Sequence, residues 1–207
     1  MQFADLQQQH EVAQLGMWAF LATEVLFFGG LILAYTVYRV AYPADFAAAA
    51  GHTKIVIGTA NTAILLFSSF LVAWAVTAAK LEQARVAALL LASAAVLGTI
   101  FLGLKATEYL QEYREHLVPG VNFEFAAEQA KGAALFFTFY FIATGLHALH
   151  VLIGIGVLAT IARLASARAY SERYHAPITV AGLYWHFVDT VWIFLFALIY
   201  LPGRSGT

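Results

Sequence analysis

The stretch that decides the fold is Val180–Leu201, VAGLYWHFVDTVWIFLFALIYL, close to the C-terminal end of the sequence. It is apolar along almost its whole length and meets the roughly 20 residues that an α-helix needs to cross a bilayer. His186 and Asp189 interrupt it three positions apart, so they share one face of the helix. Because an ionisable side chain is unfavourable inside a membrane, this pair needs polar partners on other helices.

Four further apolar runs precede this one in the sequence. Each is long enough to span a bilayer, and each must be helical because only a helix satisfies its own backbone hydrogen bonds in lipid. The sequence therefore predicts an all-α membrane protein, a bundle of five transmembrane helices that forms a single membrane domain over residues 1–207. We expect the helices at residues 15–38, 55–76, 86–110, 133–163 and 180–201.

The composition agrees with this class and excludes several others. The 207 residues are 62% hydrophobic and 11% charged, with a mean hydropathy of +0.77, whereas soluble domains are about 45–50% apolar and about 25% charged. A net charge of −1 gives no electrostatic reason to expect nucleic-acid binding. The absence of cysteine rules out disulfides, iron–sulfur clusters and thiolate metal sites.

Basic residues in the connections predict the orientation of the bundle, because such residues are retained on the cytoplasmic side. The connections on one side contain Lys80, Arg85, Arg163, Arg168 and Arg173. The opposite side contains a long acidic connection and the residues Arg39, Lys54 and Arg204. We therefore expect a cytoplasmic N-terminus and a periplasmic C-terminus.

Glu24 lies inside the first apolar run. A carboxyl group in such a helix is stable when it is protonated, paired or next to water. Two interpretations stay open at this stage: a neutral acid that is hydrogen-bonded to a neighbouring helix, and a group that relays protons or acts as an internal ligand.

The histidines of the fourth run are a second candidate group. His147 and His150 lie three residues apart on one helix face and, with His186 and Asp189, make three imidazoles and a carboxylate. Such a set can ligate a metal, and facing histidines can hold haem. Interhelical hydrogen bonding is the interpretation we favour, because the His-Glu-x-x-His spacing of zinc proteases is absent.

Lys105 and Glu108 lie three residues apart, where the third run becomes amphipathic. We interpret them as a paired interfacial group whose long side chains reach the membrane surface. The glycines Gly145, Gly154 and Gly156 are interpreted as positions of close helix packing.

Five segments resemble the signatures of subunit III of haem–copper respiratory oxidases. They occur in the family's order: TEVLFF at Thr23–Phe28, NTAILLFSS at Asn61–Ser69, LKATEYLQEY at Leu104–Tyr113, FIATGLHALHVLIG at Phe141–Gly154 and YWHFVDTVWIFLFALIY at Tyr184–Tyr200. The chain departs from the family's seven-helix form, whose first two helices it lacks. It also lacks the carboxylate that many members carry near the position of Thr179. The resemblance therefore indicates a short, five-helix bacterial form of the family.

The resemblance implies a non-catalytic core subunit of a proton-pumping cytochrome c oxidase in the inner membrane, acting in aerobic electron transport. Such a subunit stabilises subunit I, binds phospholipid and supports proton uptake, while haem and copper are held by subunits I and II. It implies no catalytic residue and no metal ligand in this chain, and it places Glu24 at the proton-uptake and lipid-cleft region. It assigns interhelical polar contacts to Asn61, His147, His150, His186 and Asp189.

Other functions are also compatible with these residues. The same family includes subunit III of quinol oxidases and accessory proteins of nitric-oxide reductases. A membrane metalloenzyme or b-haem protein would use His147, His150 and His186. A proton-coupled transporter would use Glu24, although the sequence has none of the internal repeats that are frequent among transporters.

Overall fold

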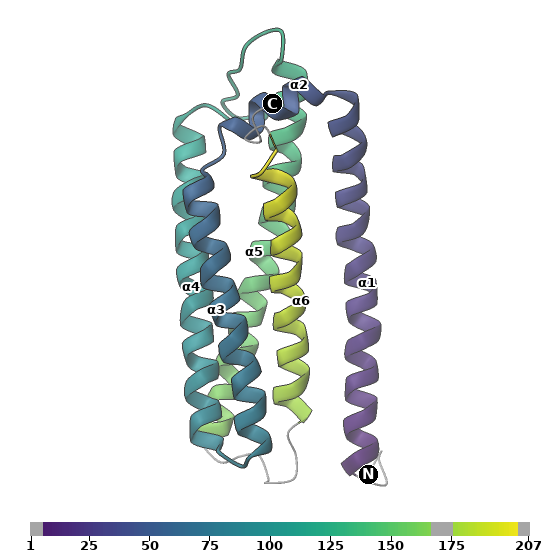
Figure 1. Cartoon of the computed structure of the whole chain (residues 1–207), viewed down its shortest axis with the longest axis vertical. Coiled ribbons are helices and arrows are strands. Elements are labelled where there is room, and N and C mark those ends of the chain that lie inside the picture. Colours follow the sequence, from purple (N-terminus) through teal and green to yellow (C-terminus); the bar gives the residue numbers. More distant parts are fainter. Residues whose placement is uncertain (1–5, 167–175, 203–207) are drawn as a thin grey trace.

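The computed structural model describes residues 6–166 and 176–202, and its regular elements there are all helices (Figure 1). They are α1 (Leu6–Ala41), α2 (Pro43–Gly51), α3 (Ile55–Lys80), α4 (Ala84–Arg114), α5 (Ala130–Ser166) and α6 (Ala176–Ile199). All except α2 contain a segment long and apolar enough to cross a membrane. This confirms the predicted all-α class with five spanning helices.

The short helix α2 corrects the prediction of five helices, because the described residues form six. It begins at Pro43, where a fixed backbone angle and a missing N–H suit the first helical position. Its residues Phe46, Ala49 and Ala50 are buried, and the Phe46 ring packs edge-on against Phe136 of α5 at 5.6 Å. With nine residues, α2 is too short to span a membrane, and hydropathy over spanning length predicts a connection there.

Successive long helices run in opposite directions along the bundle (Figure 1). The end at which α1 begins, here called the N-terminal end, also holds the turn between α3 and α4. It carries Lys80, Arg85 and Arg163. The other end, here called the α2 end, carries Arg39 and Lys54. The remaining residues of the orientation argument, Arg168, Arg173 and Arg204, lie outside the described residues.

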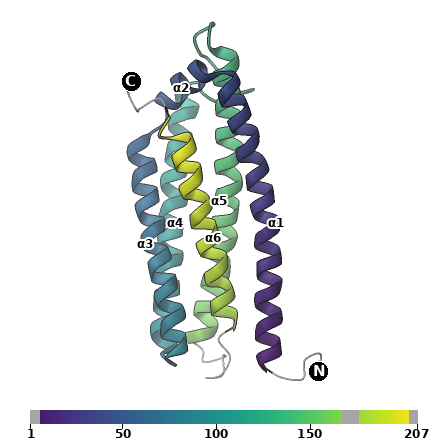
Figure 2. The same cartoon turned by 45° about the vertical axis from the view of Figure 1, so that its right-hand side comes forward.

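Helices α3, α4, α5 and α6 form a four-helix core, and α1 lies along its edge against α5 and α6 (Figure 2). In the most apolar stretch of α1, only 11% of residues are buried, against 33–50% in the other four spanning helices. Apolar side chains such as Leu26, which is 77% exposed, therefore face outward along α1. This outer surface is available to lipid or to another polypeptide.

Trp185 of α6 occupies the centre of the four-helix core. Its indole is fully buried and lies against Gly98 of α4 and Gly154 of α5. A Cβ atom built on either glycine would come within 2.8 Å of the indole ring. The two glycines are therefore needed to admit the tryptophan between α4 and α5, which agrees with the packing interpretation of Gly154. That interpretation is wrong for Gly156, where an added Cβ would meet nothing within 4 Å.

A chain of hydrogen bonds continues from this tryptophan to the other core helices. Trp185 Nε1 donates to Ser68 Oγ on α3 at 3.1 Å, and Ser68 Oγ donates to the carbonyl of Ala94 on α4 at 3.2 Å. Lipid offers no alternative partner for these groups, and interhelical packing and hydrogen bonds hold membrane helices together. This tryptophan thus contacts all three of the other core helices directly or through a single hydroxyl.

Adding one methyl group at Gly98 or Gly154, the two positions that face Trp185, should weaken the bundle. We expect Gly98→Ala and Gly154→Ala each to lower the free energy of unfolding by about 1–3 kcal/mol, because overpacking shifts the indole of Trp185. Thermal unfolding of the purified protein in detergent micelles measures this. Matched controls on the same helices are Gly103→Ala and Gly156→Ala, where a Cβ meets nothing within 4 Å.

The controls should unfold at or slightly above the temperature of the parent protein, because alanine favours a helix over glycine. Equal unfolding temperatures for Gly98→Ala and Gly103→Ala would show that close packing of Gly98 against Trp185 does not stabilise the bundle.

Candidate functional site

Glu24 and His150 meet between α1 and α5, near the middle of both helices. Glu24 Oε2 lies 3.2 Å from His150 Nε2, and His150 Nδ1 lies 2.8 Å from the carbonyl of Leu146. The Tyr184 hydroxyl of α6 donates to the carbonyl of His150 at 3.0 Å. The ring of Phe28 packs edge-on against the imidazole at 5.2 Å. Glu24 thus joins the peripheral helix to the core.

The geometry restricts how this pair holds protons. The carbonyl of Leu146 only accepts, so Nδ1 of His150 carries a hydrogen. Nε2 then either accepts a hydrogen bond from a protonated Glu24 or donates one to its carboxylate. One proton is therefore shared between the two side chains. Both are only partly buried, with 18% of the Glu24 side chain and 14% of the His150 side chain exposed, so this proton lies close to the bundle surface.

His186 and Asp189 of α6 lie beside Ser69 of α3. His186 Nδ1 is 2.6 Å from Ser69 Oγ, whereas neither carboxylate oxygen of the buried Asp189 makes a hydrogen bond within the described residues. The backbone carbonyl of His186 accepts a hydrogen bond from Thr190 at 2.8 Å. The side-chain partner of His186 therefore comes from α3, and not from the α5 histidines.

His147 and Asn61 occupy a different environment, with both residues fully buried. The imidazole of His147 lies against two rings, with Phe101 at 5.5 Å and Trp192 at 5.0 Å between centroids. Neither side chain makes a hydrogen bond to another residue within the ranges 6–166 and 176–202. The structure therefore surrounds His147 with aromatic groups, and it brings together Glu24 with His150 and Ser69 with His186.

The three histidines do not converge on one point. His150 uses both ring nitrogens, one toward Leu146 and one toward Glu24, and His186 uses Nδ1 toward Ser69. Among the residues that the structure describes, no group of three or more histidine, aspartate or glutamate side chains is placed to hold a metal ion.

A buried cluster around Lys105 lies toward the α2 end of the core. Lys105 Nζ donates to Glu108 Oε2 at 3.0 Å and to the hydroxyls of Tyr140 and Tyr200, both at 2.7 Å. The Tyr200 hydroxyl in turn donates to Glu108 Oε1 at 2.7 Å. The three hydrogens of the ammonium group are therefore all used, and both carboxylate oxygens of Glu108 are hydrogen-bonded.

This cluster corrects the interpretation of Lys105 and Glu108 as a group that reaches the membrane surface. They are paired, but Lys105 is 2% exposed and Glu108 is 0% exposed. Helix α4 continues to Arg114, so the pair lies inside the bundle.

The spacing of residues along α4 indicates in the sequence itself that Lys105 and Glu108 are buried. The buried residues Leu91, Ala94, Gly98, Phe101, Lys105, Glu108 and Glu112 alternate in steps of three and four along α4. This spacing keeps them on one helix face, so the charged residues continue the buried apolar stripe.

The sequence as a whole matches one family model, that of cytochrome c oxidase subunit III, over residues 6–204. The chain belongs to this family. It is a subunit III of the haem–copper oxidases and an integral membrane protein. Membership also makes it part of a multisubunit oxidase complex.

The relatives come from two branches of the family. Cytochrome c oxidase subunit 3 of Thermostichus vulcanus is 33% identical over 191 residues, which cover 92% of this chain and 87% of the relative. The protein of the same name from a Synechocystis species is 31% identical over 192 residues, which cover 92% of this chain and 76% of the relative. A probable quinol oxidase subunit 3 from Staphylococcus aureus is 28% identical over 93% of this chain and 90% of the relative.

Removing the charge at the centre of the Lys105 cluster should destabilise this subunit III strongly. Lys105→Met leaves the buried carboxylate of Glu108 without its cation, and breaking such a pair lowers stability by about 3–5 kcal/mol. Adding Glu108→Gln to Lys105→Met should recover part of the loss, because no charge is then buried alone. Unfolding of the purified chain in detergent, followed by circular dichroism, measures both effects.

Lys54→Met is the matched control for this experiment. Lys54 pairs with Glu115 at the same end of the bundle, but their side chains are 29% and 44% exposed. Exposed ion pairs contribute about 0–1 kcal/mol, so this variant should unfold almost as the parent does. Similar losses in Lys54→Met and Lys105→Met would show that burial of the cluster is not important for stability.

Proposed function

We propose that this chain is the non-catalytic core subunit III of a proton-pumping cytochrome c oxidase in a bacterial inner membrane. In this role the chain forms a single membrane domain over residues 1–207, stabilises subunit I and supports proton uptake. Haem and copper are bound by subunits I and II, and phospholipid fills the surfaces between the polypeptides. The family match over residues 6–204 is the observation that carries this proposal.

The distribution of basic residues supports an orientation with the N-terminal end in the cytoplasm. Lys80, Arg85 and Arg163 lie at that end, and Arg39 and Lys54 lie at the α2 end. In this orientation the proton-sharing pair of Glu24 and His150 lies midway across the membrane.

The position of this pair supports a part in proton uptake. Glu24 lies on the least buried spanning helix and shares a single proton with His150. Transfer of this proton from one partner to the other only reverses the direction of one hydrogen bond. The pair can therefore accept a proton from one side and release it to a neighbouring subunit. Among the remaining polar groups of the family signatures, Asn61, His147 and Asp189 are buried in the bundle and His186 is partly buried, and we assign all four a structural role.

Purification of the intact complex tests the proposed identity. We expect the chain to copurify in mild detergent with polypeptides that carry haem and copper, and the complex to oxidise reduced cytochrome c with oxygen. The isolated chain should contain neither haem nor a redox metal. A stoichiometric Soret band or bound copper in the isolated chain would contradict the proposal and favour a membrane metalloenzyme.

Similarity to the Staphylococcus aureus relative supports a second candidate, subunit III of a quinol oxidase. The same preparation separates the two candidates. A complex that consumes oxygen with a quinol, and does not use reduced cytochrome c, would establish the second candidate and exclude the first.

Replacing the carboxyl group of Glu24 tests the proton-uptake role. We expect Glu24→Gln to slow proton uptake by the assembled complex and to shorten the time over which it stays active in turnover, because an amide cannot share a proton with His150. Proton uptake is followed with a pH-sensitive dye after reaction with oxygen. Haem and copper content should stay unchanged.

Glu82→Gln is the control for this variant. Glu82 is exposed in the turn between α3 and α4 at the N-terminal end, so the same substitution there removes a carboxyl group that is far from His150. Equal proton-uptake rates in Glu24→Gln, Glu82→Gln and the parent complex would exclude Glu24 from proton uptake.

A further inference from the structure

Glu112 of α4 is a fully buried acid without a hydrogen-bond partner. It is 0% exposed, and neither oxygen of its carboxyl group makes a hydrogen bond within residues 6–166 and 176–202. A carboxylate in such a place is unfavourable, because it has lost its hydration and no hydrogen bond compensates for the loss. The groups around Glu112 therefore decide whether it is ionised or carries a proton.

Neither of the two lysines that act on Glu112 is free to form an ion pair with it. Lys105 already uses all three hydrogens of its ammonium group within the cluster described above. Lys54 is paired with Glu115 at the surface of the bundle. An ionised Glu112 would be a second buried carboxylate, after Glu108, beside a single buried lysine.

The other titratable groups that face Glu112 supply no cation either. They are Glu108 on the same helix and the phenols of Tyr109, Tyr140 and Tyr200. The Tyr200 hydroxyl donates its hydrogen to Glu108, whereas the Tyr140 hydroxyl accepts from Lys105 and has its own hydrogen left to share. Since every neighbour is neutral, anionic or already paired, the carboxyl group fits this site as a neutral acid.

Glu112 lies close to one end of the bundle. It precedes Arg114, the last residue of α4, by two positions, or about 3 Å along the axis at 1.5 Å per residue. The first residue of α4, Ala84, is about 42 Å away by the same measure. This end of α4 lies at the same end of the bundle as α2 (Figure 1). A proton on Glu112 therefore has its shortest path to solution at the α2 end.

An open pocket of about 500 Å³ lies at the α2 end next to the residues that follow Glu112. Leu117 lines this pocket, and its backbone N–H donates to the carbonyl of Glu112 at 3.0 Å. The polar side chains of its wall are those of His52, Glu115, Glu124 and Gln129. Imidazole, carboxylate and amide groups hold water by hydrogen bonds, so the pocket can bring water close to the buried carboxyl group.

We propose that Glu112 is a buried proton-binding site that exchanges its proton with the solution through the pocket at the α2 end. The site is separate from the pair of Glu24 and His150, which lies between α1 and α5 near the middle of both helices. In the orientation proposed above, Glu112 holds a proton on the side to which a proton-pumping complex releases protons. This last role rests on the proposed function, whereas proton binding itself depends only on this chain.

Infrared spectroscopy of the purified complex tests the protonation of Glu112, because a carboxylic acid and a carboxylate absorb at different frequencies. At neutral pH, we expect Glu112→Gln to lose one carboxylic-acid band of the parent complex and to keep all carboxylate intensity. The matched control is Glu115→Gln, one turn further along the chain, where the side chain is 44% exposed and paired with Lys54. This control should lose carboxylate intensity and keep the carboxylic-acid band.

The stability of Glu112→Gln is a second measurement on the same variant. An amide has almost the size of a carboxylic acid and is also neutral, so the variant should unfold at the temperature of the parent chain. If the site instead held an ionised carboxylate with a bound cation, the amide would lose the cation and unfold at a lower temperature. A clear loss of stability would therefore contradict the proposal.

The path of the proton is tested by filling the pocket. Ala126 lines the pocket, and Ala127 is an equally exposed neighbour that does not. After transfer of the complex into heavy water, the carboxylic-acid band of Glu112 should shift as its proton is replaced by deuterium. We expect Ala126→Trp to slow this shift severalfold and Ala127→Trp to leave its rate unchanged.

Three further results would each overturn the proposal. They are a carboxylic-acid band that persists in Glu112→Gln, a loss of carboxylate intensity in that variant, and equal deuterium exchange in Ala126→Trp and Ala127→Trp. Oxygen consumption by the same preparations is measured separately. An active complex without the Glu112 band would refute the proton site alone, and an inactive complex with the band would refute the proposed oxidase function alone.

Discussion

Trp185 lies between two helices that approach closely because they carry glycine opposite its ring, and the rest of the core depends on this contact. A methyl group on Gly98 or Gly154 would meet the indole at 2.8 Å, so the spacing of α4 and α5 is matched to the thickness of one aromatic ring. The Ser68 hydroxyl extends the contact to α3. Inside a membrane, shape and hydrogen bonding of this kind replace the hydrophobic effect as the cause of helix association.

Polar residues inside the bundle form two levels with different properties. Near the middle of the membrane, Glu24 with His150 and Ser69 with His186 are partly exposed pairs between helices. Toward the α2 end, Lys105 and Glu108 are enclosed, and all hydrogens of the ammonium group are used. The enclosed level lies inside the four-helix core, whereas the partly exposed level reaches the surface of the bundle.

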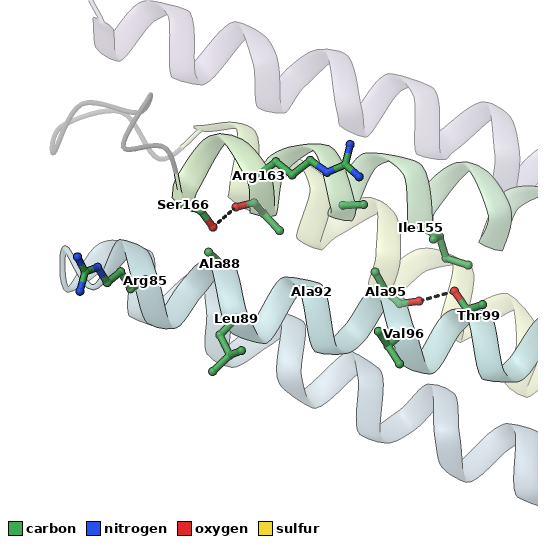
Figure 3. Close-up of a pocket in the computed structure, with 12 residues that line it drawn as sticks. Arg85, Ala88, Leu89, Ala92, Ala95, Val96, Thr99, Ile155, Arg163 and Ser166 are labelled. Carbon is green, nitrogen blue, oxygen red and sulfur yellow. Dashed lines mark hydrogen bonds between the residues drawn. The ribbon is translucent and has the colours of Figure 1, made fainter.

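Helix α1 is attached to the core at few points. It is held to the core through Glu24 and through the Tyr35 hydroxyl, which donates to the carbonyl of Leu198 at 2.8 Å. Most of its remaining surface is exposed. A groove between α4 and α5, which includes Arg85 and Arg163 among its lining residues, lies on an adjacent side of the bundle (Figure 3).

The sequence by itself determined the five spanning helices and the family, because length, hydropathy and ordered local motifs are properties of consecutive residues. It also identified Glu24, His150 and His186 as polar residues within apolar helices. Only the tertiary structure decided their partners, since Glu24 and His150 are separated by 126 positions and no local pattern pairs them. The same holds for Lys105, whose burial depends on Tyr140 of α5 and on Tyr200, the residue after the end of α6. Hydropathy records how unfavourable a charge is in lipid, but the residues that compensate for it are brought together only when the helices pack.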